Sequence, residues 1–564
     1  MWHPLSSVRS YLSQRLTPER KAWISKLRHG EHSWQRPLDR GSKRSPTIAT
    51  GFDARAEQRR SLASVRDALS VAGVDFVELP TLSSFSPTLV TDADYAAPTI
   101  EALMSRLGTS DDGERDSPEH SDDWRLGVRS SEGAEVSLGR ARRRPGTVTA
   151  IVCQRHIIAP NCRELSTSAQ KVTVEFWDCA GSAVPRADGG AHLPGTLIRR
   201  RSEHDLTVDY IEPAVWHAAQ KNDSRLDFPA PHLKVLHEPV DIVYTWVDGS
   251  DSEWRDRMRN RREGLDLRTA ESSSISESRF TSRDELKYSL RSLEYYASWA
   301  RHIYIVTDRQ IPAWLDTSHP KITVVDHREI FADPDVLPVF NSHAIESQLH
   351  HIEGLSDHYL YLNDDCFFLR PTEPGLFFTA NGLAKHFPSI VPIDIGSWSP
   401  RDLPINSAAK QGREYLLSTY GRTVTHRFKH TPHPQLRPVL DEMESEHPQL
   451  FAKVAASPFR SPEDMSIPSS LHHFDAFARG RSVEGQINYQ FVDLGQDDLE
   501  LRLGRVARRT DLDVFCLNET DLPHDSEDTV NEVVERFLAD RFPVPSSFEL
   551  CVSETESATP APPE

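Results

Sequence analysis

Short apolar runs that end at acidic residues dominate the hydrophobic pattern in the middle of the chain. Four such runs stand out: 242–247, 303–307, 322–325 and 359–362. The residues that follow them are Asp248, Asp308, Asp326 and Asn363-Asp364-Asp365. Runs this short, rich in β-branched and aromatic residues, are typical of buried strands in a parallel sheet. Because ligands bind beyond the carboxyl ends of such strands, the pattern predicts a carboxylate cluster at a binding edge.

Helical segments separate these strands. Leu286, Leu290, Leu293 and Tyr296 form one apolar stripe that ends near Ser298. The preceding segment Ser282–Glu285 has the form of a capping box, with Ser followed three residues later by Glu. Strand–helix–strand alternation predicts an α/β fold, here a Rossmann-like, mainly parallel sheet with helical additions over residues 238–549.

Three other stretches surround this predicted catalytic domain. The sequence pattern of residues 50–235 predicts a separate α/β or α+β accessory domain of unknown role, with a polar loop near 108–145. Its clearest elements are a helix at 59–74 and strands at 147–152 and 171–177. The tail 553–564 contains three prolines and is predicted to be disordered.

Residues 1–48 hold ten Lys and Arg against three Asp and Glu. Their apolar positions fall close to helical spacing, which predicts a basic amphipathic segment. Two interpretations stay open: the helix rests on an anionic membrane surface, giving peripheral membrane contact, or it packs on the next domain.

Composition excludes several classes of protein. The formal net charge of −19 argues against general nucleic-acid binding. No apolar stretch is long enough to span a membrane, and the N-terminus lacks the pattern of a secretory signal. Six scattered cysteines show no zinc-binding spacing. We therefore expect a cytoplasmic protein, at the inner face of the membrane if residues 1–48 contact it.

The Asn363-Asp364-Asp365 triplet is the first candidate site. Adjacent carboxylates at a strand end suit a hard divalent cation such as Mg²⁺ or Mn²⁺, which takes oxygen ligands. Asp pairs also occur at ordinary strand ends, so the triplet alone leaves both interpretations open.

A second candidate is the segment from Asn341 through His343 to Glu346. Asn341 or Ser342 can cap a helix here, leaving backbone donors for an anion. An ordinary capped helix with a surface glutamate is the alternative.

Two later segments also carry chemistry. His430 and His433 are held beside prolines, and histidine titrates near neutrality as a general base should, although loop histidines are often incidental. Arg460 can grip a phosphate or form a surface ion pair with Glu463 or Asp464. A further short strand runs from Asp513 towards Asn518 and Glu519.

These segments resemble, in order, the four conserved blocks of the Stealth family of phosphotransferases, which act on bacterial capsules and exopolysaccharides and include animal GlcNAc-1-phosphotransferase. The quoted stretches are DIVYTWVDGSD at 241–251, RFTSRDELKYSLRSLEYY from 279, NSHAIESQLHHIEGLSDHYLYLNDDCFF from 341, HTPHPQLRPVLDEMESEHP from 430, FRSPEDM from 459 and DVFCLNET from 513. Residues 1–235 lie outside the resemblance.

The resemblance implies transfer of a sugar 1-phosphate from a nucleotide-sugar such as UDP-GlcNAc to a glycan hydroxyl, releasing a nucleoside monophosphate. The implied catalytic residues are Glu346, Asp365, His430 and Arg460. Asp364 and Asp365 would hold Mg²⁺ or Mn²⁺. The expected substrate-binding residues are Asp248, Asn341, His343, Asn363 and His433.

Two departures from the family pattern occur, at Arg309 and Glu519. The first stands where many members have Gly, and the second where Asp usually follows Asn518. We expect His430 to accept the acceptor's proton, with Glu346 as the alternative, because histidine has the nearer intrinsic pKa. Two other functions stay open: a metal-dependent glycosyltransferase releasing UDP, and a nucleotide-sugar-binding regulator without turnover.

Overall fold

A computed structural model describes residues 47–107, 124–130, 135–186, 188–200, 207–263, 280, 282–399, 401–402, 404–519 and 527–550. The predicted N-terminal segment, except for its last two residues, and the predicted disordered tail lie outside these ranges. Within them, no helix combines the length and the apolar character that crossing a membrane requires.

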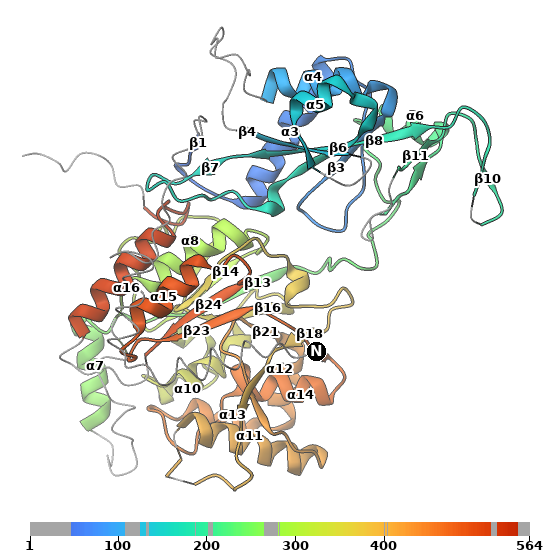
Figure 1. Ribbon diagram of the computed structural model, residues 1–564. Helices are drawn as coiled ribbons and strands as arrows, with labels where there is room; N and C mark the ends of the chain where they lie inside the picture. The colour runs from blue at the N-terminus through green and yellow to red at the C-terminus, as the bar shows by residue number, and fades with distance from the viewer. Residues whose placement is uncertain are drawn as a thin grey trace, which may run out of the picture.

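A five-stranded sheet forms the centre of the larger region (Figure 1). In spatial order its strands are β15 (Ile322–Asp326), β14 (Ile303–Thr307), β13 (Val240–Thr245), β16 (His358–Asn363) and β21 (His433–Leu436). The first four are parallel, and β21 pairs antiparallel with β16. The prediction that the four apolar runs share one mainly parallel sheet is confirmed, although β13 starts two residues earlier than expected.

Burial explains why these runs became strands. All five residues of β14 are buried, as are the first five of β13. Strands covered on both faces need continuous apolar sequence rather than alternation. The acidic residues come where the cover ends, at the carboxyl edge.

Helices cover the two sides of this sheet. On one side α15 and α16 lie beside α8, and α11 to α14 group on the other (Figure 1). Their bounds are α7 Ser252–Glu263, α8 Glu285–Ala297, α9 His327–Ile330, α10 Ser342–Glu346, α11 Pro404–Tyr420, α12 Arg437–Glu446, α13 Pro448–Ala455, α14 His472–Ala478, α15 Leu499–Arg508 and α16 Glu527–Arg541.

A three-stranded sheet brings the late part of the chain to the central edge. It contains β17 (Cys366–Phe368), β24 (Val514–Asn518) and β23 (Tyr489–Asp493). Antiparallel pairing sets Cys366 opposite Cys516. Asn518 and Glu519 therefore lie next to the turn that carries Asp364 and Asp365. Two smaller sheets pair β18 (Ala384–His386) with β22 (Ser482–Glu484), and β19 (Pro388–Pro392) with β20 (His426–Phe428).

The capping box predicted for α8 is wrong. Asp284 precedes the helix in the left-handed conformation, with φ of 60°, and makes no capping hydrogen bond through its side chain. Glu285 instead accepts a hydrogen bond from the backbone N–H of Arg283 at 2.6 Å. The glutamate is turned towards the cavity described below, which removes it from a capping role.

The N-terminal region folds around its own sheet, in the order β12-β11-β8-β6-β4-β5, with β3 also paired to β8 and β2 to β3. Its strands are β2 Val77–Glu78, β3 Thr88–Asp92, β4 Trp124–Ser130, β5 Glu135–Val136, β6 Val148–Arg155, β8 Val172–Cys179, β11 Leu197–Ile198 and β12 Tyr210–Ile211. Its helices are α3 Ala54–Val71, α4 Ala96–Leu107, α5 Leu138–Arg143 and α6 Pro213–Lys221.

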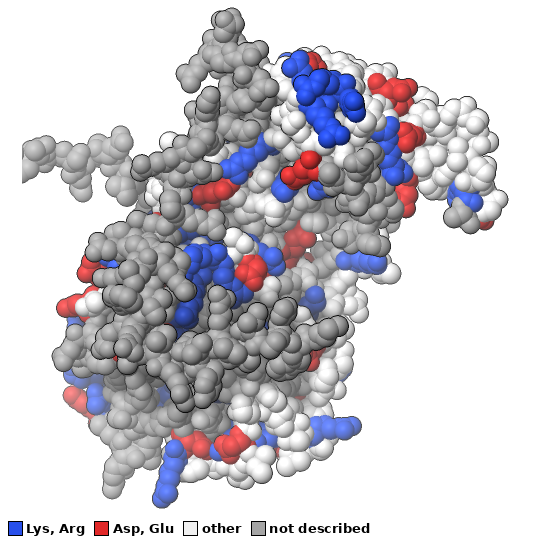
Figure 2. All heavy atoms as spheres, in the orientation of Figure 1, with Lys and Arg blue, Asp and Glu red and all other residues white. Residues whose placement is uncertain are grey.

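The predicted polar loop near 108–145 is wrong from Trp124 onwards. β4 and α5 both lie within it, and residues 108–123 lie outside the described ranges. Trp124, Val128 and Ser130 of β4 are buried, but interleaved arginines hide this apolar face in the sequence. Arg140, Arg142 and Arg143 of α5 are exposed. Figure 2 shows a basic area at the top of the view, where Figure 1 places this helix.

The two regions share packing where they meet. Phe52 and Ile157 belong to the same buried cluster as the central sheet. Thr47–Ile48 (β1) pairs with Ile157–Ile158 (β7) and brings this segment together. Arg163 forms an ion pair with Asp540 of α16 at 2.7 Å, so polar contacts also cross the junction.

Candidate active site

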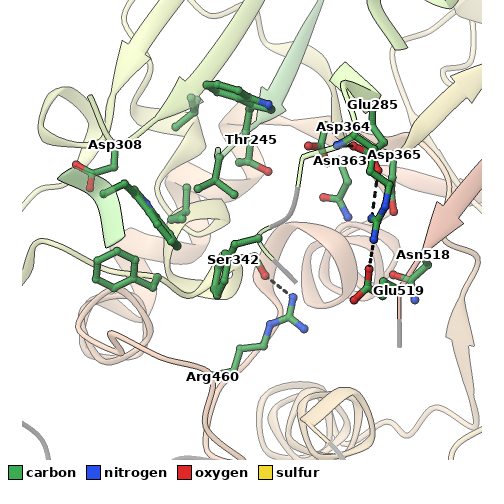
Figure 3. Close-up of a pocket in the computed structure, with 18 of the residues that line it drawn as sticks. Thr245, Glu285, Asp308, Ser342, Asn363, Asp364, Asp365, Arg460, Asn518 and Glu519 are labelled. Carbon is green, nitrogen blue, oxygen red and sulfur yellow. Dashed lines mark hydrogen bonds and ion pairs between the residues drawn. The ribbon is translucent and has the colours of Figure 1, made fainter. Parts of the chain in front are cut away.

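A cavity of about 240 Å³ lies at the carboxyl edge of the central sheet. Figure 3 shows Glu285, Asp364, Asp365, Asn518 and Glu519 grouped in one part of it. Arg460 and Ser342 lie in another part, and Asp308 lies apart from both. The predicted residues Asn363, Asp364, Asp365 and Arg460 are thus brought together in one cavity.

Crowded carboxylates define the acidic group. Burial, and then the neighbouring Glu285 and Asp365, raise the pKa of Asp364 well above its usual value. Burial also raises the pKa of Glu285, against the lowering effect of Arg283. The positive charge beside Asp364 and Glu285 is therefore too small to offset their burial and mutual repulsion.

Arg283 ties this acidic group to the late strand β24. Its guanidinium donates a hydrogen bond to Glu519 at 2.6 Å and lies 3.5 Å from Glu285. Glu519, which departs from the usual family Asp, is therefore engaged by Arg283. Its longer side chain still reaches the cavity wall.

Arg460 is placed by the loop before the π-helical turn Ile467–Leu471. Its Nη2 donates to the Ser342 hydroxyl at 2.7 Å, at the start of α10. The surface ion pair considered for Arg460 is not what the structure contains: Glu463 pairs with Lys453, and Asp464 accepts from Asn341.

An aromatic group lines the rest of the cavity. Trp254 packs against Phe280 and Phe340, with ring centroids 4.9 and 5.2 Å apart. Asp308 lies beside it and accepts a hydrogen bond from Arg257 at 2.9 Å. Gly249 is required here, because its N–H donates to the Phe280 carbonyl at 2.8 Å and a Cβ would overlap that carbonyl.

His430 contacts the acidic group from the side, although it does not line the cavity. Its Nε2 lies 3.5 Å from the Asp365 carboxylate and 3.4 Å from the Asn363 amide nitrogen. Burial is the largest single effect and lowers the pKa of His430, but the charge and hydrogen bond of Asp365, together with Cys516 and Glu346, raise it to about 9. Without a bound cation, this pKa favours a protonated imidazole at neutral pH.

Glu346 lies at the end of α10 and does not line the cavity, whereas Ser342 and Ile345 of the same helix do. Its carboxylate accepts hydrogen bonds from the hydroxyls of Ser466 and Ser469, at distances from 2.9 to 3.1 Å. Burial raises the pKa of Glu346 to about 7, despite these hydrogen bonds and the nearby Arg460 and Tyr361. A carboxyl group with this pKa exchanges protons near neutrality.

Four of the predicted substrate-binding residues do not line the cavity. Asp248 accepts from the backbone N–H and hydroxyl of Ser250, so it shapes the turn after β13. Asn341 is fully buried, caps α10 and donates to Asp464. His343, one residue after Ser342, also lies outside the lining.

His433, the fourth, is buried at the start of β21. Its Nδ1 lies 3.1 Å from Nε2 of His473, and burial lowers its pKa to about 3. His433 therefore packs in a histidine-rich core. Its strand, β21, pairs with β16, and His433 does not line the cavity.

Cys366 and Cys516 meet beneath the acidic turn, with 2.8 Å between their Sγ atoms. With His430 they form a group whose potential ligand atoms lie within 4.8 Å of one another. Spacing along the sequence does not reveal this group, because 150 residues separate the two cysteines.

Sequence reasoning also overlooked Arg283, Glu285 and the aromatic residues Trp254, Phe280 and Phe340. Glu285 is part of the stretch from residue 279 that resembles the family. It was interpreted there as a capping residue, so its place in the cavity was not predicted. The aromatic residues carry no signal of their own, since each also suits an ordinary core.

Comparison with known proteins matches four family descriptions to this chain in order. They are Stealth protein conserved region 1 at residues 238–266, region 2 at 279–386, region 3 at 429–476 and region 4 at 505–559. An exopolysaccharide phosphotransferase of Streptomyces coelicolor is 39% identical over 388 residues, which cover 67% of this chain and 70% of that relative. The chain belongs to the Stealth family.

Other Stealth relatives match over less of their length. A second S. coelicolor exopolysaccharide phosphotransferase is 47% identical over 311 residues, covering 55% of this chain and 52% of the relative. This chain thus spans about half the length of that protein. The exopolysaccharide phosphotransferase CpsY of Mycobacterium tuberculosis is 39% identical over 321 residues, covering 57% and 60% respectively.

Among solved structures, the galactosyltransferase LgtC in complex with donor and acceptor sugar analogues aligns with 52% of this Stealth chain and 95% of its own. The sequence identity is 12% and the TM-score is 0.26, which is too low to support an inference. The α/β class rests instead on the parallel sheet and its covering helices.

Proposed function

We propose that this chain transfers a sugar 1-phosphate from a nucleotide-sugar, such as UDP-GlcNAc, to a hydroxyl group of a glycan, with release of a nucleoside monophosphate. Membership in the Stealth family supports the proposal, as does the name exopolysaccharide phosphotransferase carried by its relatives.

One observation carries the proposal: Arg460 and the acidic group line the same cavity. Phosphoryl transfer depends mostly on positioning and charge stabilisation. A planar guanidinium can hold two oxygens of the transferred phosphoryl group. Ser342 fixes the guanidinium at 2.7 Å, so its orientation is set before substrate enters.

The acidic group fits a divalent cation. Asp364, Asp365 and Glu285 offer oxygen ligands, which Mg²⁺ and Mn²⁺ prefer. Burial and mutual repulsion raise the pKa of Asp364 and Glu285, and added positive charge would let these carboxyl groups ionise together. We propose that Asp364 and Asp365 hold the cation. When bound, it would neutralise charge on the donor diphosphate.

The aromatic end of the cavity supports a place for the nucleoside. Trp246, Trp254 and Phe340 line it, and aromatic side chains suit contact with a nucleobase. With the base there and the diphosphate near the acidic group, the phosphoryl group next to the sugar would lie within reach of Arg460. Asn363 lines the stretch between these groups.

The pKa directions favour Glu346 as the proton acceptor and reverse the preference drawn from the sequence. A base must be unprotonated: burial raises the pKa of Glu346 to about 7, in the range that a base needs, whereas His430 lies against Asp365, which helps to raise its pKa to about 9 when no cation is bound. We propose that Glu346 takes the proton from the acceptor hydroxyl and that His430 orients Asp365 and Asn363.

The nucleotide product tests this proposal. Purified protein with UDP-GlcNAc, a glycan acceptor and Mg²⁺ should release UMP in step with sugar-phosphate incorporation, and Asp365→Asn should abolish the release. UDP as the product would identify a glycosyltransferase, and donor binding without any product would identify a regulator. Either result overturns the proposed reaction.

A further inference from the structure

A second cluster of ligand-type side chains lies outside the cavity. It consists of His350, His351 and Glu444, whose potential ligand atoms all lie within 4.8 Å of one another. The histidines belong to the 3-10 turn Leu349–His351, directly after α10. Glu444 projects from α12.

The three side chains converge on one point. Nε2 of His350 and Nε2 of His351 lie 2.8 and 2.7 Å from the same carboxylate oxygen of Glu444. The two imidazole rings are close, with centroids 4.1 Å apart. Two imidazoles and one carboxylate form a ligand set that binds Zn²⁺ in proteins.

Hydrogen bonding fixes the tautomer of His351. Its Nδ1 lies 2.8 Å from the carbonyl oxygen of Ile330. A carbonyl only accepts, so Nδ1 carries the hydrogen, and the lone pair of a neutral ring is then on Nε2. Metal-bound histidines usually have this arrangement, with the far nitrogen donating to a carbonyl or carboxylate.

The same geometry is awkward for a cluster with neither a metal nor an extra proton. A lone pair on Nε2 of His351 would face the Glu444 oxygen at 2.7 Å, which is repulsive. His350 is buried, and its Nδ1 has no hydrogen-bond partner among the described residues. A cation between the two rings and the carboxylate removes the repulsion.

The cluster is also accessible. The side chain of His350 is fully covered, whereas those of His351 and Glu444 are 26% and 25% exposed. An ion can therefore enter from the side of His351, and water can complete its coordination. Asp441, which precedes Glu444 by almost one helical turn, adds negative charge near both histidines.

We propose that His350, His351 and Glu444 form a binding site for one Zn²⁺-class transition metal ion, separate from the oxygen-ligand site at Asp364 and Asp365. The bound ion would join the turn after α10 to α12. Because Glu346 ends α10, the site would hold the segment that carries this residue. The proposal does not depend on the reaction assigned to the cavity.

Cobalt binding tests the site without measuring activity. The full chain is stripped with a chelator and titrated with Co²⁺ in millimolar Mg²⁺, which fills oxygen-donor sites and is a poor competitor at imidazole. The wild type should bind one Co²⁺ with visible absorption bands, and Zn²⁺ should displace it. Zn²⁺ should also raise the melting temperature.

Three variants make the assignment specific. His351→Ala and Glu444→Gln should each weaken Co²⁺ binding by at least the 10- to 100-fold that loss of even an outer partner costs. Glu444→Gln retains an oxygen that can accept hydrogen bonds, so it guards against loss of folding. His426→Ala removes an exposed histidine of β20 and should bind as the wild type does.

Two outcomes would overturn the site. One is a wild type without the Co²⁺ bands, which would leave the cluster as a hydrogen-bonded His–Glu–His contact. The other is equal affinity in the wild type, His351→Ala and Glu444→Gln, which would place the ion elsewhere.

Discussion

The Arg460 guanidinium donates a hydrogen bond to the Ser342 hydroxyl at 2.7 Å, across 118 residues of sequence. This contact joins the two segments that place an arginine across the cavity from the acidic group. Among the described lining residues, no other arginine lies in that part of the cavity. Substitutions at the two residues can separate the effect of this hydrogen bond from the effect of the guanidinium charge.

Arg460→Ala should lower kcat by roughly 10²–10³, the usual effect of losing one preorganised charge-stabilising donor. Ser342→Ala removes only the orienting hydrogen bond to a charged group, worth about 1.5 kcal/mol, and should lower kcat by only about tenfold. Steady-state kinetics of UMP release measures both. A Ser342→Ala variant as inactive as Arg460→Ala would contradict a role limited to orientation.

Removal of divalent cations should abolish activity. The carboxylates of Asp364 and Asp365 are crowded, and without a cation they repel the donor diphosphate. EDTA should stop UMP release, and excess Mg²⁺ or Mn²⁺ should restore it. Asp365→Asn should stay inactive with either ion while keeping its circular dichroism spectrum. Asp497→Asn changes an exposed acid and serves as the control; full activity after metal removal would disprove the requirement.

Activity should rise with pH through an acidic limb near pH 7. Burial raises the pKa of Glu346 to about 7, so this carboxyl group is protonated below that pH and cannot accept a proton. Glu346→Gln should eliminate the limb together with most of the rate. If the limb survives in Glu346→Gln and disappears in His430→Ala, His430 is the base.

Ser469→Ala should move the same limb to higher pH. The Ser469 hydroxyl lies within hydrogen-bond distance of both oxygens of Glu346, and the hydrogen bond that it donates stabilises the ionised form. A hydrogen bond to a charged group contributes about 1.5 kcal/mol or more, which corresponds to roughly one pH unit. Ser470→Ala, in the same π-helical turn, should leave the limb in place. An unchanged limb in Ser469→Ala would show that this serine does not set the protonation of Glu346.

Tyr295→Phe should loosen the C-terminal segment after α16. The Tyr295 hydroxyl donates to the Val544 carbonyl at 2.6 Å and accepts from the Val544 N–H at 2.7 Å. Phenylalanine leaves two buried backbone groups unpaired, at a cost of about 1–3 kcal/mol. Hydrogen exchange at Val544 should accelerate by roughly 5- to 150-fold.

The control for Tyr295→Phe is Tyr304→Phe, because Tyr304 is also buried and its hydroxyl makes no hydrogen bond among the described residues. Exchange at Val544 should stay at the wild-type rate in that variant. Equal protection in both variants would show that the paired hydroxyl contributes little.

The central strands could be predicted because each is an uninterrupted apolar run ended by a polar residue. Ile303–Thr307 matches β14 residue for residue. Where strands carry arginines on the open face, as β4 does, the alternation is masked, and the strand was interpreted as loop.

The candidate site was harder to predict because contacts across long sequence separations decide it. Asp364, Asp365 and Arg460 could be named from their types and from the family resemblance. The buried state of Asn341 and His433, and the pKa values of Glu346 and His430, depend on neighbours that only the folded chain brings together.

The shared packing at Phe52 and Ile157 bears on how this protein can be dissected. A fragment that begins at the predicted domain boundary near residue 238 would lack Phe52. The rings of Tyr295 and Tyr296, which pack against Phe52 at centroid distances of 5.4 and 6.3 Å, would then lose this cover. In this fragment Asp540 would also lose its ion pair with Arg163. The conserved regions of the sequence therefore do not mark the smallest unit that can be purified: a fragment for crystallisation or assay should begin before β1, at or upstream of Thr47.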